Sequence, residues 1–314
     1  LSFDDGVASY GDLVENEVSN SRVGLTVTQE FGSSVLTFDF LTGLGFGQSS
    51  DYSQTGDPDF LDWRRTFVRK LEFSLKTESA GEFSFGQGSM ATDGVAQSDL
   101  SGTKVAMYNG LDTVAGKYQF RTASGALSGI DIDDTFTSFD SSRRGRIRYD
   151  SPSLNNFTFS AAYGKDILST NNNDTYVDAA VRYENEIGDT KIVGSLGFAR
   201  RTRGDTDRDD TFGSVSALHS SGANITLAAG SRKNDGQYGL IKVGYIGDWL
   251  PMGKTALAVD YYNGGDFVTD GSSSKSIGIG VVQKIDAANM EAYLVVRNYE
   301  YTDTTTGYQD ASSV

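Results

Sequence analysis

Apolar and polar residues alternate along most of the chain with a period of two. In the segment 144–150, for example, Ile147 and Tyr149 alternate with Arg144, Arg146 and Arg148. In a β-strand, successive side chains point to opposite faces, so this period gives each strand one apolar and one polar face. The pattern therefore predicts an all-β protein.

Turn residues divide the pattern into sixteen predicted strands. These strands span residues 1–5, 20–31, 34–45, 64–78, 81–89, 144–151, 155–164, 174–187, 190–201, 210–220, 223–233, 237–247, 254–264, 274–285, 289–301 and 310–314. Short connections alternate with long ones, which in an antiparallel meander places the tight turns at one end and the long loops at the other. The first and last strands are cut short by the chain ends, so we expect further end segments to complete them.

The amino-acid composition agrees with a large sheet and excludes many kinds of metal, disulfide and catalytic site. The 314 residues include 37 Gly, 3 Pro, 18 Phe and 16 Tyr, but no Cys and a single His. Disulfides, iron–sulfur clusters, cysteine zinc sites, thiol nucleophiles and multi-histidine metal sites are thereby excluded. The formal net charge of −15 makes nucleic acid an unfavourable partner, because phosphate contacts need clustered Lys and Arg. We therefore expect neither a nucleic-acid partner nor an enzyme.

The charged polar face and the large strand number favour a membrane barrel over a large soluble β-domain, which is the alternative. Sixteen strands enclose an interior too wide for side chains to fill, so the charged face has to border water. Strands of about ten residues, tilted near 45°, also match the height of the bilayer core. The sequence thus predicts one domain, residues 1–314, forming a transmembrane antiparallel β-barrel of 16 strands with its apolar face toward lipid.

Two adjacent segments carry a family resemblance. Residues 144–152 read Arg-Gly-Arg-Ile-Arg-Tyr-Asp-Ser-Pro, and residues 157–163 read Phe-Thr-Phe-Ser-Ala-Ala-Tyr. With the strand pattern of the whole chain, they resemble the strand pair after the pore loop of the Gram-negative outer-membrane general-diffusion porins, alphaproteobacterial type. The Pro-Glu-Phe-Gly-Gly stretch of the enteric porins is absent, and the chain ends in Val314 rather than an aromatic residue. The resemblance implies a homotrimer in the cell outer membrane, in contact with its lipids and lipopolysaccharide.

The resemblance also implies that the third long loop folds into the barrel and narrows the pore. Residues 91–142 form by far the longest connection, and their apolar residues need a surface to pack on. By parity, the polar face of the barrel wall carries a basic set, whereas this constriction loop carries an acidic set. The predicted basic set is Arg144, Arg146, Arg148, Arg22, Lys70 and Arg182, and the predicted acidic set is Asp131, Asp133, Asp134 and Asp140. We expect the two sets to approach within a few ångströms and to create a transverse field that favours hydrophilic solutes.

Three further features have competing interpretations. Arg69 has the parity of the apolar face, so we expect it at a strand end or a subunit contact. The acidic loops could bind Ca²⁺ through carboxylate oxygens, although no EF-hand spacing supports this and no cofactor is expected. His219 and Ser221 have the His-x-Ser spacing of barrel phospholipases, but they fall at a short turn without an evident orienting acid.

The predicted function is a water-filled channel for passive diffusion of ions and small hydrophilic solutes. A substrate-selective channel, for example for sugars or anions, is the nearest alternative. A barrel that serves only as an anchor or receptor, for surface layers or phage, is another. The sequence does not give solute preference, ion selectivity, size cutoff or gating.

Overall fold

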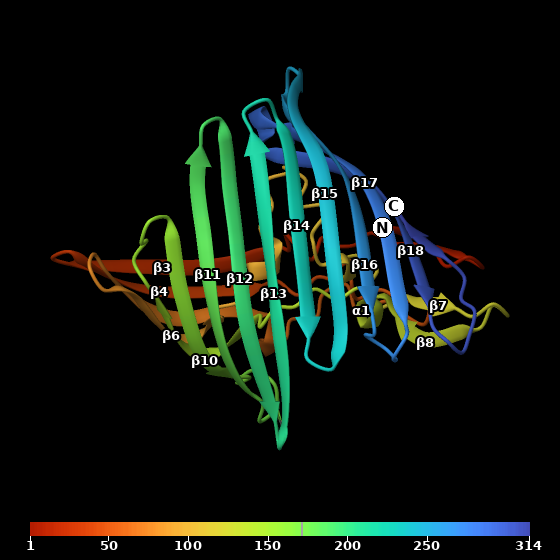
Figure 1. Ribbon diagram of the computed structural model, residues 1–314, viewed down its shortest axis with the longest axis horizontal. Coiled ribbons are helices and arrows are strands. Elements are labelled where there is room, and N and C mark those ends of the chain that lie inside the picture. Colours follow the sequence, from red (N-terminus) through yellow and green to blue (C-terminus); the bar gives the residue numbers. More distant parts are fainter. Residues whose placement is uncertain (171) are drawn as a thin grey trace.

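The computed structural model describes residues 1–170 and 172–314, and its main element is one 17-stranded antiparallel sheet (Figure 1). The long strands are β3 (Arg22–Phe31), β4 (Ser34–Gly43), β5 (Val68–Thr77), β6 (Gly81–Ser89), β9 (Arg143–Asp150), β10 (Phe157–Lys165), β11 (Thr175–Ile187), β12 (Thr190–Arg203), β13 (Thr206–His219), β14 (Ala223–Arg232), β15 (Asp235–Leu250), β16 (Gly253–Gly265), β17 (Ser273–Ile285) and β18 (Met290–Thr302). The short strands β1 (Ser2–Asp4), β2 (Ser9–Gly11) and β19 (Ala311–Ser313) belong to the same sheet.

The segment between β6 and β9 holds the remaining small elements, with two exceptions. It contains the two-stranded sheet of β7 (Gln119–Arg121) and β8 (Leu127–Asp131), the helix α1 (Ile132–Thr135), and the 3-10 turns η2 (Val95–Gln97) and η3 (Leu111–Thr113). The turns η1 (Arg65–Phe67) and η4 (Asp286–Ala288) lie next to β5 and β18. No helix in the described part of the chain is both long and apolar enough to cross a membrane.

The all-β, antiparallel prediction is confirmed, whereas the strand count differs from the predicted sixteen. Each predicted segment overlaps a strand of the sheet, and β2 is additional because Tyr10 pairs with Phe3 of β1. The expected long loop 202–209 is instead a tight hairpin. Cross-strand pairs such as Arg200–Asp209 and Thr202–Asp207 extend β12 and β13 to Arg203 and Thr206, since opposite partners stabilise the ladder.

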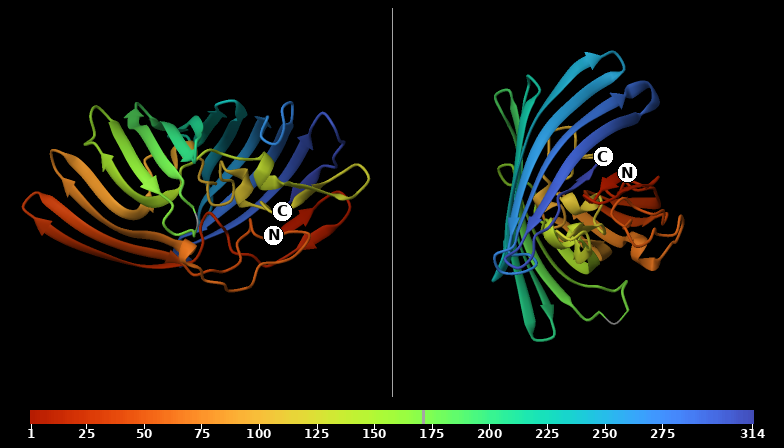
Figure 2. Two further views of the ribbon diagram at one scale, coloured as in Figure 1. Left: turned by 90° about the horizontal axis from the view of Figure 1, so that it is seen from below. Right: turned by 90° about the vertical axis from the view of Figure 1, so that its right-hand side faces the viewer.

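The registered strand pairings follow chain order from β3 to β18, except that β6 pairs with β9 because β7 and β8 form their own sheet. Strand β18 then continues through β19 and β1 to β2. Both views of Figure 2 show this sheet as a deeply curved, open trough. Neighbouring strands twist relative to each other, so a sheet of this width curls strongly. Tight connections such as Ile187–Thr190 use Gly188 at φ +58°, the left-handed conformation that a two-residue hairpin turn requires.

The two faces of the sheet differ as the alternation predicts. On the convex face large apolar side chains are exposed, and Ile147 in β9 is 62% exposed. On the concave face the neighbouring Arg146 is only 6% exposed. The convex face is therefore an extended apolar surface, and the charged residues of the strands lie inside the trough.

The long loop, residues 91–142, packs inside the trough, as expected from its apolar residues (Figure 2). Its side chains form one hydrophobic cluster with inward-facing residues of the strands. The loop contributes Val95, Ala96, Leu111, Ala115, Tyr118, Phe120, Ile132, Phe136 and Phe139, and the strands contribute Ala180, Ala199, Phe212, Ala228, Tyr238, Leu240, Tyr262, Tyr299 and Tyr301. Burying each of the larger side chains stabilises the packed loop by about 1.5–3 kcal/mol.

Candidate functional site

The long loop is held on the strands by buried ionic contacts as well as by its apolar cluster. Lys242 of β15 has its Nζ 2.7 Å from Asp99 Oδ2 of the loop, and both side chains are almost fully buried. The same ammonium donates to the carbonyl of Met107 and to Asn109 Oδ1. One strand cation thus satisfies three acceptors of the loop.

A second clamp holds the first residues of the loop. Asp178 of β11 accepts hydrogen bonds from the backbone amides of Ala91 and Thr92 and from the Thr92 hydroxyl, at 3.2, 2.8 and 2.6 Å. Arg182, four residues later on the same face, donates to the carbonyls of Ala91 and Asp93 at 2.7 and 3.1 Å. The acidic side chain therefore accepts hydrogen bonds from amides of the loop, and the basic side chain donates hydrogen bonds to carbonyls of the loop.

A third buried pair ties β16 to β18. Arg297 Nη2 lies 2.7 Å from Asp260 Oδ2, and Arg297 also donates to Ser276 Oγ at 3.0 Å. In the ladder, Gly278 of β17 pairs with Asp260 on one side and with Arg297 on the other. A Cβ at Gly278 would lie 2.5 Å from Arg297 Nη2, so the glycine makes room for an ion pair that crosses its strand.

The predicted basic row of β9 does face the inside of the trough, but its charges are paired within the wall. Arg146 pairs with Glu72 of β5 and donates to the Ser89 carbonyl at 3.0 Å. Arg148 makes two hydrogen bonds of 2.7 Å to the Asp150 carboxylate. Both arginines therefore bring little uncompensated charge to the interior.

The other predicted basic residues are also inward-facing and differ in their partners. Arg144 stacks on the Tyr176 ring, with its guanidinium carbon 4.2 Å from the ring centroid. Lys70 lies 3.3 Å from both Asp39 and Glu72. Arg22 is exposed at the start of β3, where its Nε donates to the Asn20 carbonyl.

A hollow of about 710 Å³ on this wall, toward the short turns, contains as many acidic as basic residues. Its basic residues are Lys70, Lys76, Arg146 and Arg148, and its acidic residues are Glu72, Glu78, Glu82 and Asp150. We conclude that this part of the wall is polar but close to neutral.

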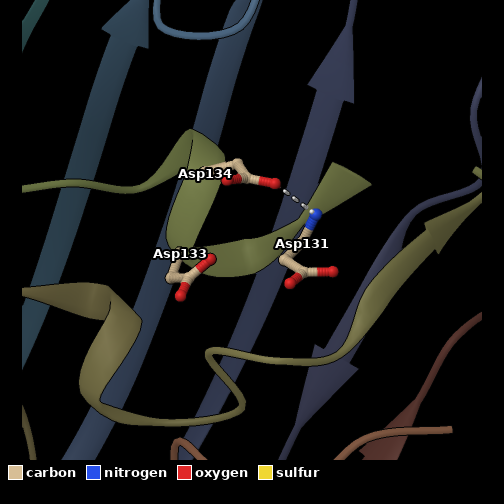
Figure 3. A group of neighbouring side chains, drawn as sticks. All are labelled: Asp131, Asp133 and Asp134. Carbon is tan, nitrogen blue, oxygen red and sulfur yellow. Dashed lines mark hydrogen bonds between the residues drawn. The ribbon is translucent and has the colours of Figure 1, made fainter. Parts of the chain in front are cut away.

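The acidic residues of the loop have their own partners. Asp131 and Asp134 form a capping box at the start of α1, in which Asp134 Oδ2 accepts from the Asp131 amide (Figure 3). Lys117, from the same loop, pairs with Asp133 and lies 3.7 Å from Asp131. Asp140 accepts from the backbone amides of Gly94 and Ser142. Its carboxylate therefore stabilises the loop conformation.

The expected close pairs of Arg146 and Arg148 with Asp131, Asp133 and Asp134 are absent from the ion pairs of residues 1–170 and 172–314. Arg146 reaches Glu72 of β5, which lies beyond the neighbouring strand β6, and Arg148 pairs with Asp150 of its own strand. Lys117 supplies the cation for Asp131 and Asp133. Period-two alternation places a side chain on a face, but it does not determine the neighbour that this side chain meets. The expectation of direct pairs was therefore wrong for Arg146 and Arg148, which lie on the inner face but have other partners.

A different set of charges lies where β5 and β9 begin. A register shift opposite Leu41 and Thr42 leaves Arg69 as the extra residue of β5, so the simple alternation is interrupted there. Arg69 is at a strand end, as expected, and lines one cavity together with Arg143 and Arg144. Arg143 Nη2 is 3.9 Å from Asp93 of the long loop.

Several loop carboxyls near this set have raised pKa values. Burial raises the pKa of Asp112 to about 7, and the charges of Glu17 and Asp133 contribute. Burial also raises the pKa of Asp140 to about 7, with a further contribution from Asp93. Burial is likewise the main cause of the raised pKa of Glu17. Asp112 and Asp140 are therefore partly protonated near neutral pH.

Sequence reasoning missed the buried residues that hold the loop, namely Lys242, Asp99, Asp178, Asp260 and Arg297. A usable signal was present, because Lys242 and Asp260 are single charges on the inner face of otherwise uncharged strand segments. Their partners could not be found, since Asp99 is 143 residues from Lys242 in the sequence.

His219 and Ser221 do lie together, with His219 Nδ1 2.8 Å from Ser221 Oγ. The same nitrogen accepts from the Ser221 backbone amide at 3.1 Å, and both residues are exposed. This is the geometry of a turn that is closed by its own side chains. Within the described residues, no carboxylate hydrogen-bonds the histidine ring.

The chain matches a family model described as Gram-negative porin over residues 4–304. An anion-selective porin from Comamonas acidovorans has a similar structure, with a TM-score of 0.61 and 16% identity over 99% of this chain and 93% of that chain. OmpT of Vibrio cholerae lacking loop L8 is similar with a TM-score of 0.57 and 16% identity, over 99% of this chain and 93% of that chain. A trimer form of OmpT has a TM-score of 0.52 and 14% identity, over 93% of this chain and 88% of that chain. No curated protein sequence matches significantly.

Proposed function

This chain belongs to the Gram-negative porin family, and we propose that it forms a closed barrel whose pore is constricted by the long loop. As a member of that family it is an outer-membrane protein that forms a channel for passive diffusion. The observation that supports a constricted pore is the packing of residues 91–142 inside the trough. In our proposal, residues 1–314 belong to one barrel domain whose sixteen spanning strands close around this loop.

The channel lies between the long loop and the wall formed by the inner faces of β3–β6 and β9. This wall is polar along its length, as an aqueous channel requires, because apolar lining would have to stay dry. We assign Arg22, Lys70, Arg144, Arg146, Arg148 and Arg182 to the pore lining, and Asp131, Asp133, Asp134 and Asp140 to the constriction loop. Arg182 and the paired arginines Arg146 and Arg148 fix the geometry of the constriction more than they set its charge.

The clamps of Lys242 and of Asp178 with Arg182 keep the loop in one position. A loop fixed by buried charge pairs resists displacement, because opening it would leave those charges unpaired in a poorly solvated site. The loop therefore does not act as a movable lid, and the cross-section of the pore is fixed.

The convex apolar face supports contact with outer-membrane lipids and, at one patch, with two further copies in a homotrimer. Ala161 and Ala179 form an exposed cross-strand pair on this face, and small residues allow close approach of another wall. The trimer form of the structurally similar OmpT supports this assembly. Lipopolysaccharide would contact the same face at the end that carries the long loops.

We assign no catalytic role and no resident cofactor to this channel. His219 and Ser221 close a turn, and Lys117 supplies the positive charge between Asp131 and Asp133 that a Ca²⁺ ion would otherwise bring. Replacing Lys117 by Met would then be the way to create calcium sensitivity at these aspartates.

Single-channel recording in planar bilayers tests the proposal. The protein with its long loop should give steps of defined conductance. A variant that lacks most of residues 91–142 should give larger steps. If both proteins are silent, or if their conductance is equal, the constricted-pore proposal is overturned. An anchor or receptor barrel with a blocked interior would show no conductance with either protein.

A further inference from the structure

A cavity of about 310 Å³ lies where β5, β6 and β9 meet the segments before β3 and after β10. At roughly 30 Å³ per water molecule, it offers room for about ten waters, or for a small organic solute of five or six carbons. Arg69, Arg143 and Arg144 line it, together with the amide side chains of Asn20 and Gln87.

The guanidinium groups of this cavity have donors to spare. The Arg69 guanidinium makes no hydrogen bond or ion pair with any residue that the structure describes. Arg143 has only the 3.9 Å contact to Asp93, and Arg144 Nε is buried without a partner. Guanidinium forks match carboxylates in geometry and bind them strongly. The cavity thus presents three cations that lack a closely bound anion.

The two amides add unpaired acceptors. Gln87 is 4% exposed and Asn20 is 7% exposed, and neither Gln87 Oε1 nor Asn20 Oδ1 accepts a hydrogen bond in the structure. A buried acceptor without a donor is costly, so such atoms are usually satisfied by protein, water or ligand. A carboxylate cannot satisfy them, because it has no proton to donate, whereas a hydroxyl group can.

The single acidic residue of the cavity, Asp166, offsets only one of its three positive charges. Asp166 is engaged by the amides of Leu168 and Ser169 and by the Ser169 hydroxyl. The combination that remains is a surplus of guanidinium donors beside amide acceptors.

We propose that this cavity is a binding site for small hydroxycarboxylates, that is, organic anions with a carboxylate and neighbouring hydroxyl groups. The carboxylate lies against Arg69 and Arg143, and the hydroxyls donate to Asn20 and Gln87. This inference rests on the proposed channel, to which it adds a preferred class of solute. A solute that is held briefly at the cavity enters the pore at a raised local concentration.

Solute block of the single-channel current tests the site. Three probes separate the contributions: gluconate has charge and hydroxyls, hexanoate has the charge alone, and sorbitol has the hydroxyls alone. Gluconate should reduce the current at the lowest concentration. Because Arg69→Gln removes a charge-assisted hydrogen bond, it should raise the half-blocking gluconate concentration by roughly tenfold or more.

The amide contribution is tested by Gln87→Leu, a change of similar volume. It should weaken block by gluconate while leaving block by hexanoate unchanged. Arg69→Lys is the control for misfolding, because it keeps the positive charge and loses only the two-donor geometry of the guanidinium. Gluconate should block this variant at a concentration between those for the wild type and Arg69→Gln. Lys191→Gln is the matched control, since Lys191 is a half-buried residue far from the cavity in the strand order, and it pairs with Glu184 near a short turn.

Equal block by gluconate and hexanoate overturns the proposal, as does unchanged block by gluconate in Arg69→Gln. Block by sorbitol at the gluconate concentration would show that charge plays no part, and it would overturn the proposal as well. A wild-type protein without any conductance would instead refute the channel on which the inference rests, so the two failures are distinguishable.

Discussion

Lys242 and Asp99 form an ion pair of 2.7 Å between the middle of β15 and the long loop, with both side chains buried. Two charges removed from water in this way are costly to separate, because the remaining one has no solvent to replace its partner. The pair therefore acts as a fixed attachment point for the loop.

Replacing Lys242 by Met should destabilise the protein by about 3–5 kcal/mol, since Asp99 is left buried without its cation. Urea unfolding of the protein in detergent measures the loss. The double variant Lys242→Met with Asp99→Leu should recover much of it, because no charge then remains unpaired. Equal stability of the single and double variants would contradict the pairing.

Arg146→Ala should also destabilise the protein, by less than the roughly 3–5 kcal/mol of a fully unpaired buried charge, because Glu72 loses one buried partner but keeps Lys70 at 3.3 Å. The freed carboxylate should in addition move the reversal potential in a salt gradient toward cations. The pair variant Glu72→Gln with Arg146→Met should reverse both effects. A cation shift that persists in the pair variant would show that Arg146 itself sets the charge of the pore.

Gly278→Ala tests the ion pair that crosses β17. The added Cβ would lie 2.5–2.8 Å from atoms of Arg297 and Asp260, so the pair has to move. Overpacking of this kind costs about 1–3 kcal/mol, measured again by urea unfolding. Gly239→Ala is the matched control, because a Cβ at Gly239 of β15 meets nothing within 4 Å. Similar losses in both variants would assign the effect to strand glycines in general.

The pore should become more cation-selective as pH rises from 5 to 8. Asp112 and Asp140 have pKa values raised by burial to about 7, so both are mainly protonated at pH 5 and mainly ionised at pH 8. Reversal potentials measured at the two values give the shift, and Asp112→Asn with Asp140→Asn should abolish most of it. An undiminished shift in this variant would assign the titration to other groups.

The same pKa values predict the direction of the stability change. The folded pKa exceeds the ordinary value of 3.8, so the folded protein binds more protons between about pH 4 and pH 7. This contribution to stability is therefore fully present below pH 4 and is lost as pH rises through 7. Proteolysis of the long loop should accordingly be slower at pH 5 than at pH 8.

The sequence by itself determined the strands and their two faces. Period-two alternation depends only on successive residues, so it placed Ile147 on the convex face and Arg146 on the concave face. The length and apolar content of residues 91–142 likewise predicted that the loop packs against the sheet, because its aromatic side chains have to be buried somewhere.

Only the tertiary structure decided which charges meet. Arg146 pairs with Glu72 and Lys242 with Asp99, at separations of 74 and 143 residues, and these contacts depend on strand register and on the path of the loop. The register shift at Leu41 and Thr42 also left Arg69 beside Arg143 and Arg144 at one cavity. A single extra residue in one strand cannot be seen in the alternation of that strand, since it depends on how the neighbouring strand pairs with it.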